Sequence, residues 1–103
     1  MNDRILSFLG ICKRAGKLAS GADTVVKSVN SKKSRLVLYA ADFSENSLKP
    51  VLRAAGENGV RVIKLDCSKQ ELSFALGRLS GVLSVDDPGF ASKLVQMLDL
   101  QNR

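Results

Sequence analysis

Leu36-Val37-Leu38-Tyr39-Ala40-Ala41 is an unbroken apolar run near the middle of the chain. A short run of this kind is typical of a β-strand that is buried on both faces of a sheet. The segment 42–47 follows it, in which every residue except Phe43 is polar, and it predicts a turn. A sheet buried on both faces needs helices above and below it, so the flanking sequence should supply them.

Helical patterns lie on the N-terminal side of this strand. Apolar residues repeat at helical spacing over 3–15 and again over 21–32, with a short extended link at 17–20. We expect Asn2 or Asp3 to cap the first helix and Gly16 to end it. Ser20 is the expected cap of the second helix.

Helices and strands alternate on the C-terminal side. The pattern predicts a helix with Pro50 in or near its first turn, a strand over 60–65, and a helix that begins with the capping box Ser68-Lys69-Gln70-Glu71 and buries Leu79. A strand over 82–85 and a helix after Asp87-Pro88 complete the chain. This alternation predicts one α/β domain over residues 1–103, with a mainly parallel sheet covered on both faces.

The composition restricts the chemistry of the protein. The 103 residues include no histidine, and the two cysteines lie far apart in the sequence. These features disfavour acid–base catalysis and a zinc site. The chain also lacks an apolar stretch long enough to span a membrane and a recognisable secretory signal. We therefore expect a cytosolic protein with reduced thiols, no metal and no cofactor.

The excess positive charge lies in the first third of the chain. Residues 1–35 hold eight basic and two acidic side chains, whereas residues 36–103 hold eight of each. A basic segment of this kind attracts a polyanion, and nucleic acid is the commonest one in the cytosol. The alternative is a solvated basic surface that only aids solubility.

The segment from Gly21 to Lys27 opens the second predicted helix. A helix start offers free N–H groups to phosphate, and a glycine there lets a phosphate or a base approach the backbone closely. Lys27 shares a helix face with Asp23 and Thr24, so the three side chains could meet base edges together. The structural alternative is that Asp23 favours the first turn and pairs with Lys27 four residues later.

Two aspartates define an alternative enzymatic function. Asp42 and Asp66 follow successive predicted strands, where an open α/β sheet often has its active site. Two such carboxylates could bind Mg²⁺ in a small enzyme that acts on a phosphate ligand. Aspartates also follow strands for structural reasons, because they favour turns.

Several segments, taken in order, resemble one family. They are Leu9-Gly10, 14–18, Ser20-Gly21, Lys27, 36–40, Asp42 with 44–46, 68–72 with 75–77, and Asp87 with 89–91 and 93–94. This set resembles the L7Ae/L30e ribosomal protein family, and its small bacterial members most closely. The resemblance runs over nearly the whole chain.

The resemblance implies a fold and a ligand. The fold is a three-layer α/β/α sandwich with a four-stranded mixed sheet. The ligand is kink-turn RNA, a bent internal loop with tandem sheared G·A pairs. In the family the start of the second helix enters the RNA groove, and the loop after the fourth helix supports a flipped-out nucleotide. By matching position, the groove residues are Gly21, Asp23, Thr24 and Lys27, and the loop residues are Arg78, Leu79, Ser80, Gly81 and Val82.

This chain differs from the strongest kink-turn binders at two places. One is the loop after the fourth helix, which is less apolar because it contains Arg78, Ser80 and Gly81, and the other is the start of the second helix. Those proteins carry Asn-Glu where this chain has Asp23-Thr24. Aspartate accepts hydrogen bonds but does not donate as asparagine does, and threonine is shorter than glutamate and uncharged. The chain therefore presents a different set of donors and acceptors to a base edge.

We thus expect a non-catalytic, monomeric protein that binds structured RNA, either ribosomal RNA or another kink-turn RNA, and associates with the ribosome rather than with a membrane. Basic side chains should contact phosphates; they are Lys13, Arg14, Lys17, Lys32 and Lys33. The alternative is a protein-interaction module on the same fold.

Overall fold

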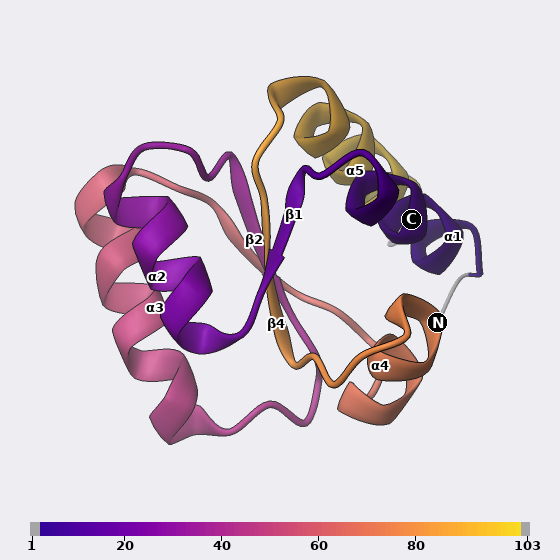
Figure 1. Cartoon of the computed structure of the whole chain (residues 1–103), viewed down its shortest axis with the longest axis horizontal. Coiled ribbons are helices and arrows are strands. Elements are labelled where there is room, and N and C mark those ends of the chain that lie inside the picture. The colour runs from indigo at the N-terminus through magenta and orange to yellow at the C-terminus, as the bar shows by residue number, and fades with distance from the viewer. Residues whose placement is uncertain (1–2, 102–103) are drawn as a thin grey trace.

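The computed structural model describes residues 3–101, and Asn2, one of the two expected caps, lies outside them. The elements expected from the sequence are present in the expected order (Figure 1). They are α1 Asp3–Arg14, β1 Leu18–Ser20, α2 Ala22–Asn30, β2 Leu36–Tyr39, α3 Glu45–Asn58, β3 Val62–Lys64, α4 Lys69–Leu76, β4 Val82–Val85 and α5 Pro88–Gln101.

The four strands form one mixed sheet in the order β1-β4-β2-β3. β4 lies between β1 and β2 and runs antiparallel to both, while β2 and β3 are parallel. The expectation of a mainly parallel sheet is therefore wrong, and the mixed sheet implied by the family resemblance is confirmed. An apolar run indicates only that a strand is buried on both faces. β2 and β4 are buried because they are the two central strands, and this holds for parallel and antiparallel strands alike.

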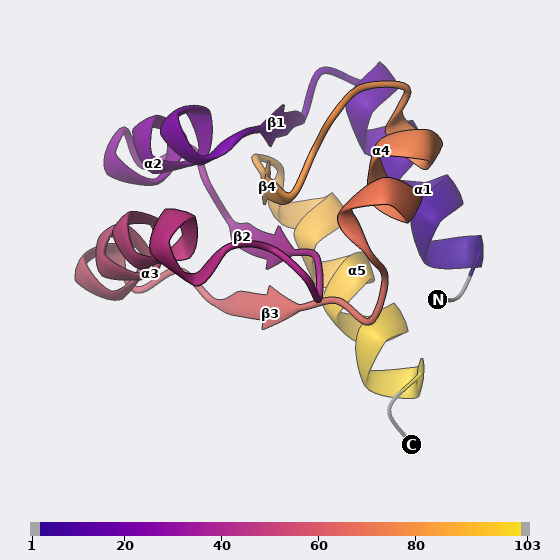
Figure 2. The same cartoon turned by 90° about the horizontal axis from the view of Figure 1, so that it is seen from below.

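Helices cover both faces of the sheet and complete a three-layer α/β/α sandwich. α2 and α3 pack on one face, and α1, α4 and α5 pack on the other, as the perpendicular view in Figure 2 also shows. Successive side chains of β2 enter opposite cores: Leu36 and Leu38 lie under α1, α4 and α5, and Val37 lies under α2 and α3. The alternation of a strand's side chains thus explains why this run contains no polar residue.

Two helices begin at places that the sequence did not predict. α3 begins at Glu45 within the polar segment 42–47, and the hydroxyl of Ser44 caps it, so Pro50 lies in the second turn rather than in or near the first. α2 begins after Gly21, which replaces Ser20 as its N-cap. The segment 42–47 therefore contains both the turn after β2 and the start of α3.

Two other predicted helix starts are confirmed. Ser68 and Glu71 form the capping box of α4, with each side chain accepting a hydrogen bond from the other residue's backbone N–H at 3.0 Å. At the start of α5, the Phe90 N–H donates to Asp87 Oδ2 at 2.9 Å. These local signals fix where α4 and α5 leave the sheet.

A buried cluster of hydroxyl groups attaches α2 to the sheet. Ser84 of β4 is fully buried on the α2 side, and its hydroxyl lies 2.6 Å from Asp86 Oδ1 and 2.7 Å from Ser34 Oγ. The Ser28 hydroxyl of α2 donates to the same Asp86 oxygen at 2.7 Å. Because buried polar groups of this kind are satisfied only in one arrangement, the cluster fixes the position of α2 on the sheet.

Candidate nucleic-acid interface

The helix expected to enter a groove starts at a glycine with a special backbone conformation. Gly21 has φ 95° and ψ 145°, a combination that side chains strongly disfavour. A Cβ built on Gly21 would meet no atom within 4 Å, so the space in front of this residue is open. In the described part of the chain no side chain caps this end of α2. The first N–H groups of the helix are therefore available to a ligand.

A backbone hydrogen bond joins the two predicted contact segments. The Gly21 N–H donates to the carbonyl oxygen of Val82 at 3.1 Å, one step beyond the pairing of β1 with β4. Gly21 therefore lies beside the loop over residues 77–81, which connects α4 to β4. Figure 1 shows the start of α2 and this loop at the same lower edge of the molecule. We call this edge the α2–loop edge.

Gly81 holds the 77–81 loop against the connection between β2 and α3. The Ala40 N–H donates to the Gly81 carbonyl at 2.9 Å. A Cβ on Gly81 would lie only 2.5 Å from Phe43 Cδ1, so the phenyl ring occupies the space that a side chain would need. Two of the predicted loop contacts, Ser80 and Val82, are 3% and 1% exposed. These two residues present almost no side-chain surface to a ligand.

Leu79 lies outside the core, contrary to the sequence prediction. α4 ends at Leu76, and Gly77 with φ 75° is its left-handed C-cap. The chain then turns away and leaves Leu79 86% exposed in the loop. Leu79, Arg78 and Phe74 border a hollow of about 620 Å³. This hollow therefore combines apolar surface with a cation.

The outer face of α2 carries the polar side chains expected on it. Asp23, Thr24 and Lys27 are all exposed. Within residues 3–101 no ion pair joins Asp23 to Lys27, so the structure does not contain the pair that the structural alternative requires. Thr24 and Lys27 border a hollow of about 330 Å³ that also reaches Lys33. The carboxylate and the ammonium group both remain available to a ligand.

Two of the predicted phosphate contacts lie near the 77–81 loop. Lys13 and Arg14 form the last turn of α1 and are exposed. The Lys13 ammonium group donates to the carbonyl of Leu76 at the end of α4, and it lies 3.9 Å from the position of a Cβ on Gly77. This contact places the basic end of α1 next to the α2–loop edge.

The other three predicted phosphate contacts lie away from Gly21, and Lys17 stays beside the end of α1, where its N–H donates to the Cys12 carbonyl at 3.0 Å. Lys17 precedes β1, and Lys32 and Lys33 follow α2, so all three lie at the ends of these elements that are remote from Gly21. The nine residues of α2 span about 13 Å. The Lys32 ammonium group also donates to Asn58 Oδ1 of α3. The basic residues thus form an elongated distribution rather than one compact cluster.

Asp42, one of the two residues of the enzymatic alternative, has a structural contact. Asp42 Oδ1 accepts a hydrogen bond from the Lys69 N–H at 2.7 Å and so supports the start of α4. Residues 3–101 contain no group of three or more His, Cys, Asp or Glu side chains that could hold a metal ion. Burial raises the pKa of the Cys12 thiol to about 11 and also raises the pKa of Cys67. Neither thiol is therefore an activated nucleophile.

The fold and the edge define the class of protein: a small α/β/α sandwich that presents a glycine-led helix start next to the α4–β4 loop. Residues 3–95 match the Ribosomal protein L7Ae/L30e/S12e/Gadd45 family. The chain belongs to this family. None of the helices over residues 3–101 has the length and apolar character needed to cross a membrane.

Two relatives carry the name RNA-binding protein YlxQ. The protein from Bacillus subtilis (strain 168) is 36% identical over 97 residues, which cover 89% of this chain and 92% of that protein. The protein from Enterococcus faecium is 28% identical over 96 residues, which cover 93% of this chain and 92% of that protein. The family and these names describe ribosomal and RNA-binding proteins, which supports the prediction that the protein is not an enzyme.

Solved structures share the fold. A protein of unknown function from Bacillus halodurans C superposes with a TM-score of 0.86 at 31% identity, over 95% of this chain and 99% of that chain. The Giardia lamblia 15.5kD RNA binding protein superposes with a TM-score of 0.73 at 23% identity, over 97% of this chain and 92% of that chain. These similarities confirm the α/β/α architecture.

Sequence reasoning missed an exposed aromatic ring. Phe74 lies on α4 and is 91% exposed. The signal was present in the sequence, because Phe74 lies off the apolar stripe that Leu72 and Leu76 form on this helix. Phe74 borders the same hollow as the exposed Leu79, and neighbouring exposed apolar side chains mark contact surfaces where a single one does not.

Proposed function

We propose that this protein is a non-catalytic RNA-binding protein that recognises structured, kink-turn-like RNA through the α2–loop edge. The observation that carries the proposal is the hydrogen bond from Gly21 to Val82, because it brings the helix start and the loop to one place. Membership of the family and the names of the relatives support RNA as the ligand.

In this proposal the start of α2 reads the bases. Gly21 lets the RNA approach the backbone, since no side chain occupies the space in front of it. Lys27 lies between one and two turns further along and reaches a guanine edge as a donor. Asp23 accepts hydrogen bonds from base amino groups, and the Thr24 hydroxyl makes a shorter contact at the same face.

The cations supply most of the affinity in this proposal. Lys13 and Arg14 meet phosphates on the loop side, Lys17 meets a phosphate beside the end of α1, and Lys32 and Lys33 meet phosphates beyond the far end of α2. Such contacts position the protein on the RNA without reading its sequence. The exposed Arg78 and Leu79 support the nucleotide at the loop, together with the backbone of Ser80, Gly81 and Val82.

We also propose the setting in which the protein acts. It acts in the cytosol as a monomer with a single domain over residues 1–103. Its partner is ribosomal RNA, and it associates with the ribosome. Family membership supports this assignment. Co-sedimentation of the protein with ribosomal particles at physiological salt tests it, and its absence from all ribosomal fractions would contradict it.

Lys27 and Lys33 form a matched pair for testing base recognition, because both border the same hollow along α2. The experiment titrates the natural protein, Lys27→Ala and Lys33→Ala against a kink-turn RNA and a plain duplex of equal length. We expect Lys27→Ala to lose about 1–3 kcal/mol of binding free energy on the kink-turn and much less on the duplex. Lys33→Ala should weaken both RNAs equally. Equal weakening of both RNAs by Lys27→Ala would contradict base recognition by α2.

A further inference from the structure

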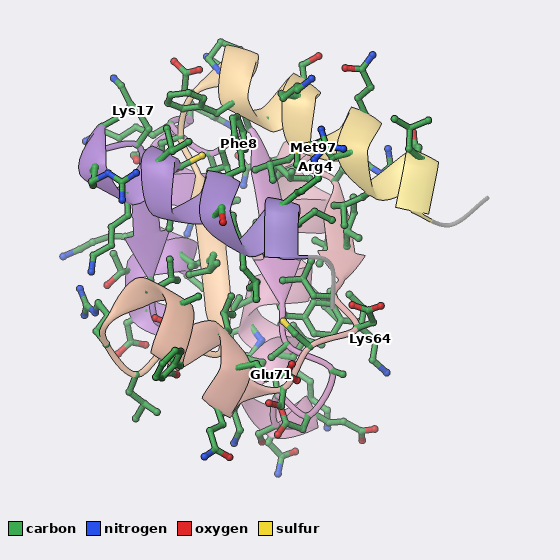
Figure 3. The ribbon with its side chains drawn as sticks, turned by 90° about the vertical axis from the view of Figure 1, so that its right-hand side faces the viewer. Arg4, Phe8, Lys17, Lys64, Glu71 and Met97 are labelled. Carbon is green, nitrogen blue, oxygen red and sulfur yellow. The ribbon has the colours of Figure 1, made fainter. Side chains whose placement is uncertain are left out.

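We propose that the groove between α1 and α4 binds an unpaired nucleotide of the same RNA, with the base on the Phe74 ring and the phosphate at Arg14. This inference rests on the proposed RNA-binding function and adds a second contact outside the α2–loop edge. α1 and α4 lie side by side on the face of the molecule shown in Figure 3.

The groove has the size and lining of a nucleotide site. It holds about 560 Å³ and is lined by Leu6, Ser7, Gly10 and Arg14 of α1 and by Phe74 and Ala75 of α4. This volume is within the range of small-molecule sites in proteins. One wall thus carries an aromatic ring, the opposite wall carries a guanidinium group, and small residues lie between them.

Gly10 keeps the groove open and sets the place of the cation. A Cβ on Gly10 would lie 3.7 Å from Arg14 Nη1, so the guanidinium group of Arg14 folds back over the glycine. The side chain of Arg14 therefore lies along the groove rather than extending away from α1. A guanidinium group held in this way presents a planar set of donors to a phosphate.

The charge around Phe74 favours an anion. The two acidic side chains next to it are held by backbone N–H groups: Glu71 accepts from Ser68 at 3.0 Å, and Asp42 accepts from Lys69 at 2.7 Å. Within residues 3–101, no acidic side chain forms an ion pair with Arg14, Lys69 or Arg78. Arg14, Lys69 and Arg78 line the hollows that Phe74 borders, so the cations outnumber the two carboxylates around the ring. A ligand that combines a flat apolar surface with negative charge fits this place, and an unpaired nucleotide has both features.

The groove is continuous with the α2–loop edge. Phe74 borders both this groove and the hollow that contains Arg78 and Leu79. The bond from Lys13 to the Leu76 carbonyl joins the ends of α1 and α4 at the same place. An RNA strand that leaves the loop therefore meets the Phe74 ring next.

The test compares a kink-turn RNA with the same RNA carrying an unpaired five-adenosine extension at its 5′ or its 3′ end. The proteins are the natural chain, Phe74→Leu and Phe74→Tyr. Leucine keeps apolar volume without a ring, and tyrosine keeps the ring; Phe74 is so exposed that neither change threatens folding. We expect one of the two extensions to tighten binding of the natural protein by about fivefold or more. Phe74→Leu should lose this gain, Phe74→Tyr should keep it, and all three proteins should bind the unextended RNA equally.

Each outcome of this experiment separates the inference from the proposed function. Unextended RNA that binds while neither extension adds affinity would overturn the inference and leave the function intact. A gain that persists in Phe74→Leu would overturn it too, because the extension would then bind elsewhere. If no protein binds any of the RNAs, the proposed function fails together with the inference.

Discussion

At the scale of single residues, Gly21 is the position on which the binding edge depends most. Its backbone conformation directs the chain from β1 into α2 and allows its N–H to meet Val82. The surroundings do not require a glycine, since a Cβ would have open space. Glycine is therefore required at this position only for its backbone conformation. The free energy that another residue would lose there can be measured by substitution.

We expect Gly21→Ala to lower the free energy of unfolding by about 1–3 kcal/mol, because alanine adopts this backbone conformation only with strain. Gly56→Ala is the matched control: Gly56 lies in α3, where a Cβ also meets no atom within 4 Å. A glycine inside a helix costs about 0.5–1 kcal/mol relative to alanine, so the control should be stabilised. Urea unfolding of both variants checks the pair, and equal effects would refute the conformational argument.

Asp23 and Thr24 give a second prediction at this scale. Replacing them by Asn and Glu restores the donor and acceptor pattern of the family's strongest kink-turn binders. We expect the double variant to bind a standard kink-turn more tightly than the natural protein, while its affinity for a plain duplex stays the same or falls. Both residues are exposed, so the change tests binding rather than folding. An unchanged kink-turn affinity would show that this face of α2 does not contact the bases.

At the scale of elements, α4 shows how a local signal sets a pH dependence. Hydrogen bonds from the backbone and the side chain of Ser68 lower the pKa of Glu71 below its usual value of 4.5. A carboxyl group whose pKa is lower in the folded protein stabilises the fold above its unfolded pKa. This contribution is lost as the pH falls through the folded pKa.

The free energy of unfolding should therefore decrease as the pH falls below 4.5, and the Glu71→Gln variant should show a smaller decrease. Urea unfolding at a series of values from about pH 3 to about pH 7 measures both slopes. Glutamine keeps the shape of the side chain and removes its titration. Identical slopes in the two proteins would mean that the capping box does not contribute to acid stability.

The elements also show what the sequence could predict and what it could not. Capping signals at Ser68 and Asp87 act within one turn of a helix, so they were visible in the sequence and are confirmed. The direction of β4 depends on which strands flank it, and no local pattern contains that information. Leu79 is a different case: its spacing continues the apolar stripe of α4, but Gly77 is a local signal that ends the helix before it, and the sequence prediction did not use that signal.

The candidate site divides in the same way. The start of α2 was visible in the sequence as a glycine-led helix start, and the loop was found by resemblance, but their contact depends on the antiparallel pairing of β1 with β4. Ser84 could not be recognised as part of a buried cluster, since its partners Ser28 and Ser34 lie about fifty residues away in the sequence. The basic segment could be recognised in the sequence. That its cations lie near both ends of α2 became clear only from the fold.

At the scale of the whole molecule, the formal net charge of +6 predicts a strong salt dependence. If Lys13, Arg14, Lys17, Lys32 and Lys33 contact phosphates, the logarithm of the binding constant should fall linearly with the logarithm of the salt concentration. Each contact removed by substitution should reduce the slope by about 0.7–0.9. Titrations at several salt concentrations measure this. A slope near zero would favour the protein-interaction module instead.

The most direct test of the central claim is a map of the surface that RNA contacts in solution. We propose to follow the backbone amide signals of the protein by NMR while a kink-turn RNA is added. The largest shifts should fall on Gly21, Thr24 and Gly81, which the hydrogen bond between Gly21 and Val82 gathers at one edge. The signal of Gly56, inside α3, should stay unchanged. Shifts confined to Lys32, Lys33 and the end of α3 would contradict the account, because the RNA would then bind at the far end of α2.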